Sequence, residues 1–85
     1  MAVSNYTATT TSGTALSANP SRQQLVITNT GTINVFLNIG SAAEVNKGYY
    51  LAPNGVWEMD KFLFTRDSVT AITPTGTSNL SIYEL

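Results

Sequence analysis

The sequence predicts an all-β fold, either a small antiparallel β-sandwich or a jelly-roll-like barrel of seven or eight strands. Short runs in which apolar and polar residues alternate with a period of two recur along the chain, and turn-forming residues separate them about every ten residues. No stretch shows the periodicity of a helix. Ser, Thr and Asn supply 29 of the 85 residues, and these residue types favour strands or turns over helix interiors.

The first section of the chain, residues 1–21, has no charged residue and is rich in small and β-branched side chains. Asn19-Pro20 ends it, because the residue before a proline is disfavoured in the helical region. Two interpretations stay open: an edge strand of the sheet, or an extended arm that lies on a neighbouring subunit. Residues 22–85 are expected to form the β-sandwich domain.

The strongest local signal lies at residues 24–29 and 33–39. These are two strand-like runs joined by Asn29-Thr30-Gly31-Thr32, which predicts a β-hairpin. The second run alternates with a period of two, so its odd-numbered residues share one face. We expect this face to point into the core; it consists of Ile33, Val35, Leu37 and Ile39.

The rest of the chain reads as further short strands separated by turns. The expected strands are 48–51, 56–60, 62–65, 68–73 and 79–84. Ala52-Pro53-Asn54-Gly55 and Pro74-Thr75-Gly76-Thr77 have the composition of turns. Within 56–60, Trp57 and Met59 alternate with Glu58 and Asp60, so we expect an apolar inner face and an acidic outer face.

Composition excludes several classes of function. A hydrophobic fraction of 42% with a net charge of −1 indicates one folded domain rather than a disordered chain. The chain has no His and no Cys, so it cannot build a Ser-His-Asp triad, a cysteine nucleophile, a zinc finger or an iron–sulfur cluster. We therefore expect no enzymatic activity and no cofactor.

The sequence also predicts no signal peptide and no membrane-spanning segment. Residues 1–20 contain no positive charge and no apolar run of signal-peptide length, and no later stretch is long enough to span a membrane. We expect a chain that is made in the cytoplasm, has no membrane partner, and leaves only if something carries it out.

One carboxylate pair could in principle hold a divalent cation or perform acid–base chemistry. Glu58 and Asp60 lie two residues apart, so on a strand they project from the same face. The simpler interpretation is the solvent-facing side of a half-buried strand, with Lys61 close by. Arg66-Asp67-Ser68 is likewise interpreted as a turn.

Binding to nucleic acid is not expected, because affinity for a phosphate backbone depends on clustered Lys and Arg. The four basic residues are scattered and are outnumbered by five acidic ones. Exposed tyrosines and asparagines also suit a carbohydrate-binding surface. They suit a protein interface equally well, since aromatic residues are enriched and charge is depleted there.

Several apolar residues fall on the strand faces opposite the expected core. Only 11% of the chain is charged, against roughly 25% in an average soluble domain, so these faces are weakly protected against association. We expect them to contact another chain, unless a sandwich edge or loop of this chain folds over them. The candidate interface residues are Val26, Phe36, Ile72 and Tyr83 on these faces, together with Tyr49 and Tyr50, which suit an interface as aromatic residues.

A longer pattern runs from Arg22 to the end of the chain. It consists of Arg22 before an apolar strand, Asn29-Thr30-Gly31, an apolar strand ending at Gly40, Leu51-Ala52-Pro53-Asn54-Gly55, a strand with Trp57, and a terminal strand ending in Tyr83-Glu84. This order and spacing resemble a group of small structural proteins in tailed bacteriophages. Each piece is ordinary turn or strand chemistry, so the likeness depends on their order.

The resemblance implies a structural virion protein, in the first place a capsid decoration (cement) protein that binds the major capsid protein on the outer shell and bridges capsomers. It also implies a homotrimer located in the virion and assembled in the host cytoplasm, and it brings no catalytic residue. Two alternatives remain: a tail or neck component of the same particle, and a carbohydrate- or cell-surface-binding module.

Overall fold

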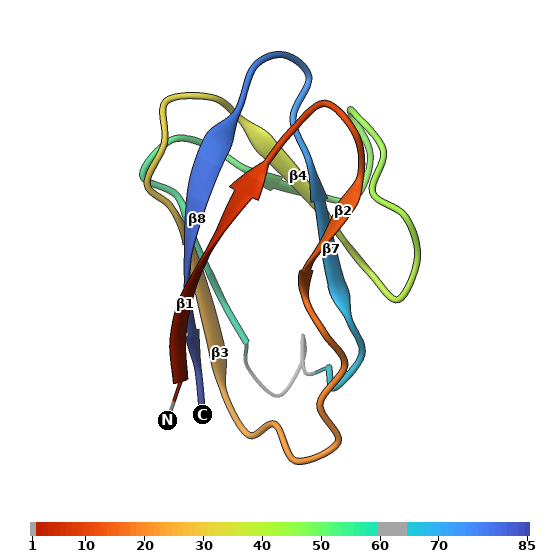
Figure 1. The fold of residues 1–85 in the computed structure, drawn as a ribbon, viewed down its shortest axis with the longest axis vertical. Coiled ribbons are helices and arrows are strands. Elements are labelled where there is room, and N and C mark those ends of the chain that lie inside the picture. Colours follow the sequence, from red (N-terminus) through yellow and green to blue (C-terminus); the bar gives the residue numbers. More distant parts are fainter. Residues whose placement is uncertain (1, 60–64) are drawn as a thin grey trace.

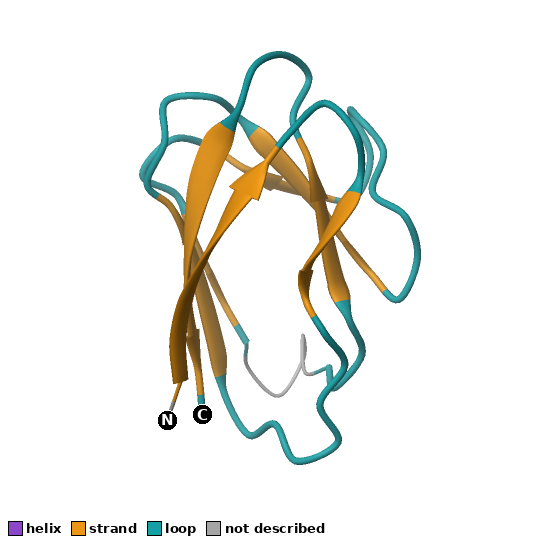
Figure 2. Cartoon of the chain, in the orientation of Figure 1, coloured by secondary structure: helices purple, strands orange, loops and turns teal. Residues whose placement is uncertain are grey.

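The computed structural model describes residues 2–59 and 65–85, and every regular element in these ranges is a β-strand (Figure 2). The strands are β1 (Ala2–Ala8), β2 (Gly13–Leu16), β3 (Leu25–Asn29), β4 (Val35–Ile39), β5 (Tyr49–Leu51), β6 (Val56–Glu58), β7 (Val69–Ile72) and β8 (Ser78–Glu84). The expected strand at 62–65 falls mostly outside the described residues, as does the end of the one expected at 56–60.

The eight strands form two antiparallel sheets of four that pack face to face (Figure 1). Sheet A has the order β1-β8-β3-β6, and sheet B has the order β2-β7-β4-β5. The first strand pairs with the last, so the two termini lie side by side at one end of the molecule. This strand order is that of a jelly roll. The predicted all-β sandwich of seven or eight strands is therefore confirmed.

The predicted hairpin between residues 24–29 and 33–39 is wrong. β3 belongs to sheet A, where it pairs with β6 and β8, and β4 belongs to sheet B, where it pairs with β5 and β7. The chain crosses between the sheets at residues 30–34 instead of turning back within one of them. Among the described strands, β4 and β5 are the consecutive pair that lie next to each other in a sheet.

The side chain of Asn29 explains this crossing. It is fully buried, and its amide group donates hydrogen bonds to the carbonyl oxygens of Ile33 (2.8 Å) and Leu51 (3.0 Å). Its carbonyl oxygen accepts hydrogen bonds from the Gly31 N–H (3.1 Å) and the Ser78 hydroxyl (2.6 Å). Asn29 thus satisfies the backbone groups that a crossing between sheets leaves without ladder partners.

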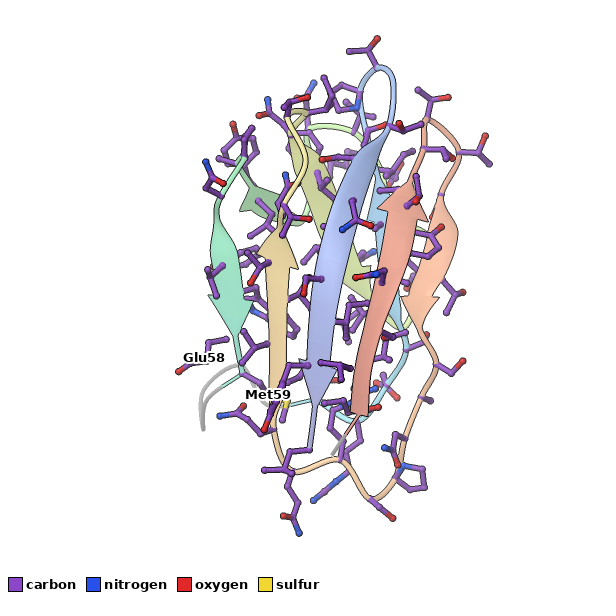
Figure 3. The ribbon with its side chains drawn as sticks, turned by 60° about the vertical axis from the view of Figure 1, so that its left-hand side comes forward. Glu58 and Met59 are labelled. Carbon is purple, nitrogen blue, oxygen red and sulfur yellow. The ribbon has the colours of Figure 1, made fainter. Side chains whose placement is uncertain are left out.

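The core consists of the inward faces of both sheets, as the period of two predicts. It is formed by Ala8, Leu25, Ile27, Val35, Leu37, Leu51, Trp57, Met59, Val69, Ala71, Leu80 and Ile82. Figure 3 shows the alternation on β6 and beyond it: Met59 is buried, whereas Glu58 is exposed. Two residues differ from expectation. Ile39 lies at the end of β4 and is 37% exposed, and Ile33 precedes the strand and is only half-buried.

Residues 2–8 and 13–16 contribute one strand to each sheet. β1 pairs with β8 along its whole length, and β2 pairs with β7. At the turn between them the Thr73 N–H donates to the Thr9 carbonyl, and Tyr6 packs so closely on Gly13 that a Cβ there would collide with the tyrosine hydroxyl. Contact of this section with a neighbouring subunit stays a prediction.

The end of the sandwich that holds the termini is closed by Arg22, which is completely buried. Its Nε donates to Glu84 Oε2 at 2.8 Å, and the two remaining nitrogens donate to backbone carbonyls. These carbonyls belong to Ser17, Thr65 and Asp67. One guanidinium therefore joins the β2–β3 connection, the residues before β7 and the last strand.

The Asn29 network leads to a stability prediction. We expect Asn29→Ala to lower the free energy of unfolding by about 3 kcal/mol, because several buried backbone and hydroxyl groups lose their partner. Urea denaturation followed by Trp57 fluorescence measures the change. Asn34→Ala is the matched control, since Asn34 is only partly buried, and it should change stability by less than about 0.5 kcal/mol. Equal effects of the two variants would contradict the role of Asn29 in stabilising the crossing between the two sheets.

The Arg22–Glu84 pair leads to a prediction about pH. Burial raises the pKa of Glu84, but hydrogen bonds from Arg22 and Asn19 and the charge of Arg22 outweigh it, so the pKa lies below its ordinary value of 4.5. The pair's stabilisation is thus fully present above pH 4.5 and is lost as the pH falls through the lower folded-state pKa. We expect Glu84→Gln to flatten the acid side of the stability profile, as measured by urea midpoints. An unchanged slope would contradict the prediction.

Candidate interaction surfaces

The six predicted interface residues lie in three different places. Val26 and Tyr83 are cross-strand neighbours on the outer face of sheet A. Phe36, Tyr50 and Ile72 lie together on the outer face of sheet B, on the opposite side of the molecule. Tyr49 is paired with Leu37 and so points inward, at the edge of the sandwich. The structure therefore does not bring the six residues into one patch.

The outer face of sheet A is partly to fully exposed and almost without charge. The strand register aligns Val3, Tyr83, Val26 and Glu58 in one row across the four strands. Val3 is 75% exposed, and Val56, which lies on the same face, is 51% exposed. Among the described strand residues of this face, Glu58 alone is charged, and the others are apolar or carry hydroxyl or amide groups.

Val3 and Val56 are the members of this face that the sequence reasoning missed. Val3 lies in residues 1–21, for which the sequence allows an arm or an edge strand and therefore predicts no face. Val56 is the first residue of its strand, next to a turn. The signal that could have found both is the alternation itself: Val3 precedes Ser4, and Val56 precedes the buried Trp57.

The outer face of sheet B is partly covered by the connection between β4 and β5. Three polar side chains hold this loop down. Asn38 donates to the Ala42 carbonyl (3.0 Å), Thr70 donates to the Ser41 carbonyl (2.6 Å), and the Ser12 hydroxyl accepts from the Ala43 N–H (2.8 Å). The loop folding over this face is the alternative that the sequence left open.

Phe36 lies on this covered face and is only 8% exposed. Its ring packs against that of Tyr50 at a centroid distance of 5.4 Å, and Ile72 is its neighbour on the other side. This differs from the expectation that Phe36 points to an accessible surface. Phe36 supports the half-exposed Tyr50 and offers little contact area of its own.

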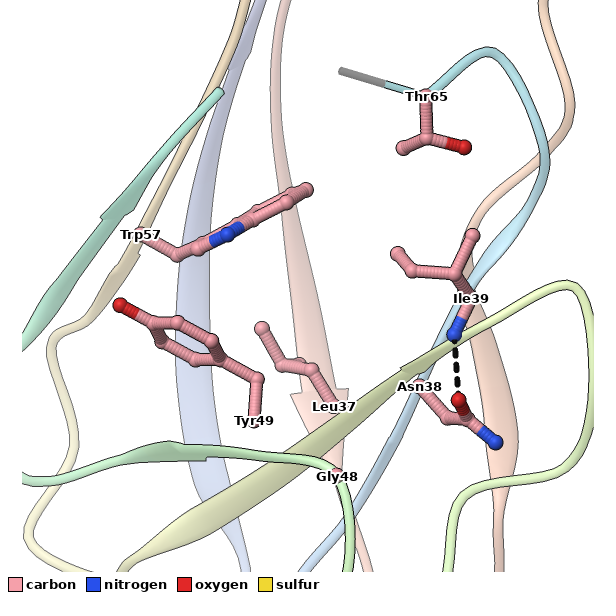
Figure 4. A pocket seen from close by; sticks show the side chains of 7 residues that line it. All are labelled: Leu37, Asn38, Ile39, Gly48, Tyr49, Trp57 and Thr65. Atoms are coloured by element: carbon pink, nitrogen blue, oxygen red, sulfur yellow. Dashed lines mark hydrogen bonds between the residues drawn. The ribbon is translucent and has the colours of Figure 1, made fainter. Parts of the chain in front are cut away.

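A groove of about 330 Å³ lies at the edge of the sandwich, between β6 of sheet A and β4 and β5 of sheet B (Figure 4). The Tyr49 and Trp57 rings, 6.1 Å apart, form its aromatic side. The other described lining residues are Leu37, Asn38, Ile39, Gly48 and Thr65. A ligand site needs a few free polar groups that converge on the ligand. The Asn38 amide, however, already bonds the Ala42 carbonyl and the Ile39 N–H.

The described residues contain no group of three or more His, Cys, Asp or Glu that could hold a metal ion. Of the Glu58–Asp60 pair, Glu58 is exposed, and Asp60 and Lys61 lie outside the described residues. The described part of the chain contains no helix that is long and apolar enough to cross a membrane.

The basic residues that the structure describes do not form a stripe for nucleic acid. Arg22 is buried, and Lys47 lies beside Glu44 on the loop over sheet B, with 3.8 Å between the charged atoms. Arg66 donates to the Arg22 carbonyl. The outer face of sheet A, with its exposed Val3 and Val56, thus remains as a candidate interaction surface.

No protein-family model, no curated protein and no solved structure matches the chain.

Proposed function

We propose that the protein is a structural, non-enzymatic component of a tailed-bacteriophage particle, a decoration protein that binds the major capsid protein on the outer shell. The observation that carries this proposal is the outer face of sheet A, where exposed valines lie among uncharged polar side chains. In its described residues this face is depleted of charge in the manner of a protein interface, and they include no cluster of the cations that nucleic acid requires.

Several residues of the phage-like pattern hold the fold together. Arg22 and Glu84 bond each other, and Asn29 bonds the carbonyl of Leu51. The shared pattern therefore marks the framework of the fold. Jelly rolls occur in viral capsid proteins and also in lectins, and a fold alone does not choose a function. The choice between these roles depends on the surface, and sheet A favours protein contact.

A carbohydrate-binding module is the second candidate, favoured by the aromatic groove at Tyr49 and Trp57. Aromatic rings beside an open groove suit the apolar faces of sugars. Binding on a glycan array that is lost in Tyr49→Ala, together with no binding to capsids, would favour this candidate over decoration.

Copy number separates decoration from a tail or neck role. We expect quantitative mass spectrometry of purified particles to find the chain in numbers comparable to the major capsid protein, with density spread over the shell in electron-microscopy maps. A handful of copies at one vertex would favour the tail or neck component, and absence from the particle would overturn the proposal.

A pair of valine variants tests which face binds. We expect Val56→Asp to weaken binding to capsids that lack the protein by at least about tenfold, because the new carboxylate must be desolvated in the contact. Co-sedimentation with such capsids measures the affinity. Val45→Asp is the matched control, since Val45 is also exposed but lies in the loop next to sheet B. If Val45→Asp weakened binding and Val56→Asp did not, the assigned face would be wrong.

A further inference from the structure

β1 is an edge strand of sheet A that lacks the usual protection against pairing with another chain. Proteins protect edge strands with charges, prolines, bulges or short length. The other three edges have such features: β2 is irregular between Thr14 and Leu16, and β5 and β6 have three residues each. β1 has seven residues, pairs with β8 without interruption, and contains neither charge nor proline.

The hydrogen bonds of β8 reveal which backbone groups of β1 are free. Gln24 and Leu85 exchange two N–H···O bonds, both of 2.9 Å, so they form a hydrogen-bonded pair in the ladder between β3 and β8. In an antiparallel ladder, bonded and non-bonded pairs alternate. The odd-numbered residues of β8 therefore bond toward β3 and its even-numbered residues bond toward β1. The bond from the Thr30 N–H to the Asn79 carbonyl, at the far end of the ladder, agrees with this.

The register then fixes the free groups on β1. The even-numbered residues of β8 face even-numbered residues of β1, as in Ser4 with Ile82. The odd-numbered residues Val3, Asn5 and Thr7 consequently direct their N–H and C=O groups to the open edge. Within the described residues, no turn, loop or side-chain hydrogen bond occupies these groups.

We propose that two copies of this chain pair antiparallel through β1, across a two-fold axis that passes through the sheet at Asn5. In this register Asn5 of one chain faces Asn5 of the other, and Val3 of each chain faces Thr7 of the other chain. Among the described residues of β1 these three carry the free groups, so each facing pair exchanges two hydrogen bonds and their free N–H and C=O groups are all satisfied. The two A sheets become one eight-stranded sheet.

The side chains of β1 fit the same register. Asn5, Val3 and Thr7 are all exposed on the outer face, and no charge opposes a like charge when the strand meets its own copy. Val3, which is 75% exposed, already has Tyr83 on one side. Thr7 of the second copy would cover its other side.

This inference does not rest on the proposed function, since it needs only a second copy of the chain. A two-fold contact uses the same patch on both copies and closes after two. The pairing therefore predicts two chains where the phage resemblance implies three.

Light scattering of the purified chain tests the number of copies. We expect a mass of twice 9.1 kDa, which falls toward one chain on dilution because an edge-to-edge contact is small. A single-chain mass up to about 1 mM, which corresponds to a millimolar dissociation constant, would overturn the proposal. A mass of three chains would also overturn it.

A charge exchange at the two-fold axis tests the register. Asn5→Lys and Asn5→Asp each place like charges opposite each other, so each variant alone should dimerise at least about tenfold more weakly at low salt. An equal mixture of the two should form a heterodimer as stable as the wild-type dimer or more so. Failure of the mixture to associate would overturn the register.

Thr28→Lys is the matched control for this exchange. Thr28 lies on the same outer face but on β3, two strands away from the edge. We expect this variant to dimerise like the wild type. A loss as large as that of Asn5→Lys would assign the contact to the face of the sheet and would contradict pairing through β1. Circular dichroism of all variants establishes that each remains folded.

Discussion

The ion pair between the buried Arg22 and the partly buried Glu84 is the interaction on which one end of the sandwich depends. A fully buried guanidinium is tolerated only when its charge is balanced and its N–H groups are bonded. Here Glu84 supplies the charge, and carbonyls of residues 17, 65 and 67 accept the remaining bonds. Removing the carboxylate would leave a cation in the interior, so the last strand, the β2–β3 connection and the segment before β7 are fixed together.

Asn29 has the corresponding role at the opposite end, but without charge. Its amide joins the crossing between β3 and β4 to the end of β5 and the start of β8. A chain of 85 residues buries a thin core, and this one has no cysteine with which to cross-link its loops. Two buried polar networks, one at each end, hold the loops in place instead. All buried side-chain polar atoms of the described residues have hydrogen-bond partners.

The sequence was sufficient to predict most of the strands and the inward residues of several of them, but not the sheet to which each strand belongs. Alternation with a period of two involves only neighbouring residues in the sequence, so it predicts that Leu25 and Ile27 point inward. Sheet membership depends on bonds between distant residues, such as Asn29 with Ser78 or Arg22 with Glu84. For the same reason the sequence could place Phe36 on an outer face but could not foresee that a loop and the Tyr50 ring would cover much of that face. It left Val3 unassigned because its strand was itself in question.

In the folded chain, most of the few charged side chains that the structure describes lie away from the outer face of sheet A. Arg22 and Glu84 bond each other at one end of the sandwich, and Glu44 and Lys47 lie together on the loop over sheet B. Sheet A consequently keeps one charged residue, Glu58, on its described outer face. A two-fold axis through Asn5 places the outer faces of both A sheets on the same side of the dimer. Pairing through β1 would therefore place two uncharged faces side by side for a larger partner, and Val3 would take part in both contacts.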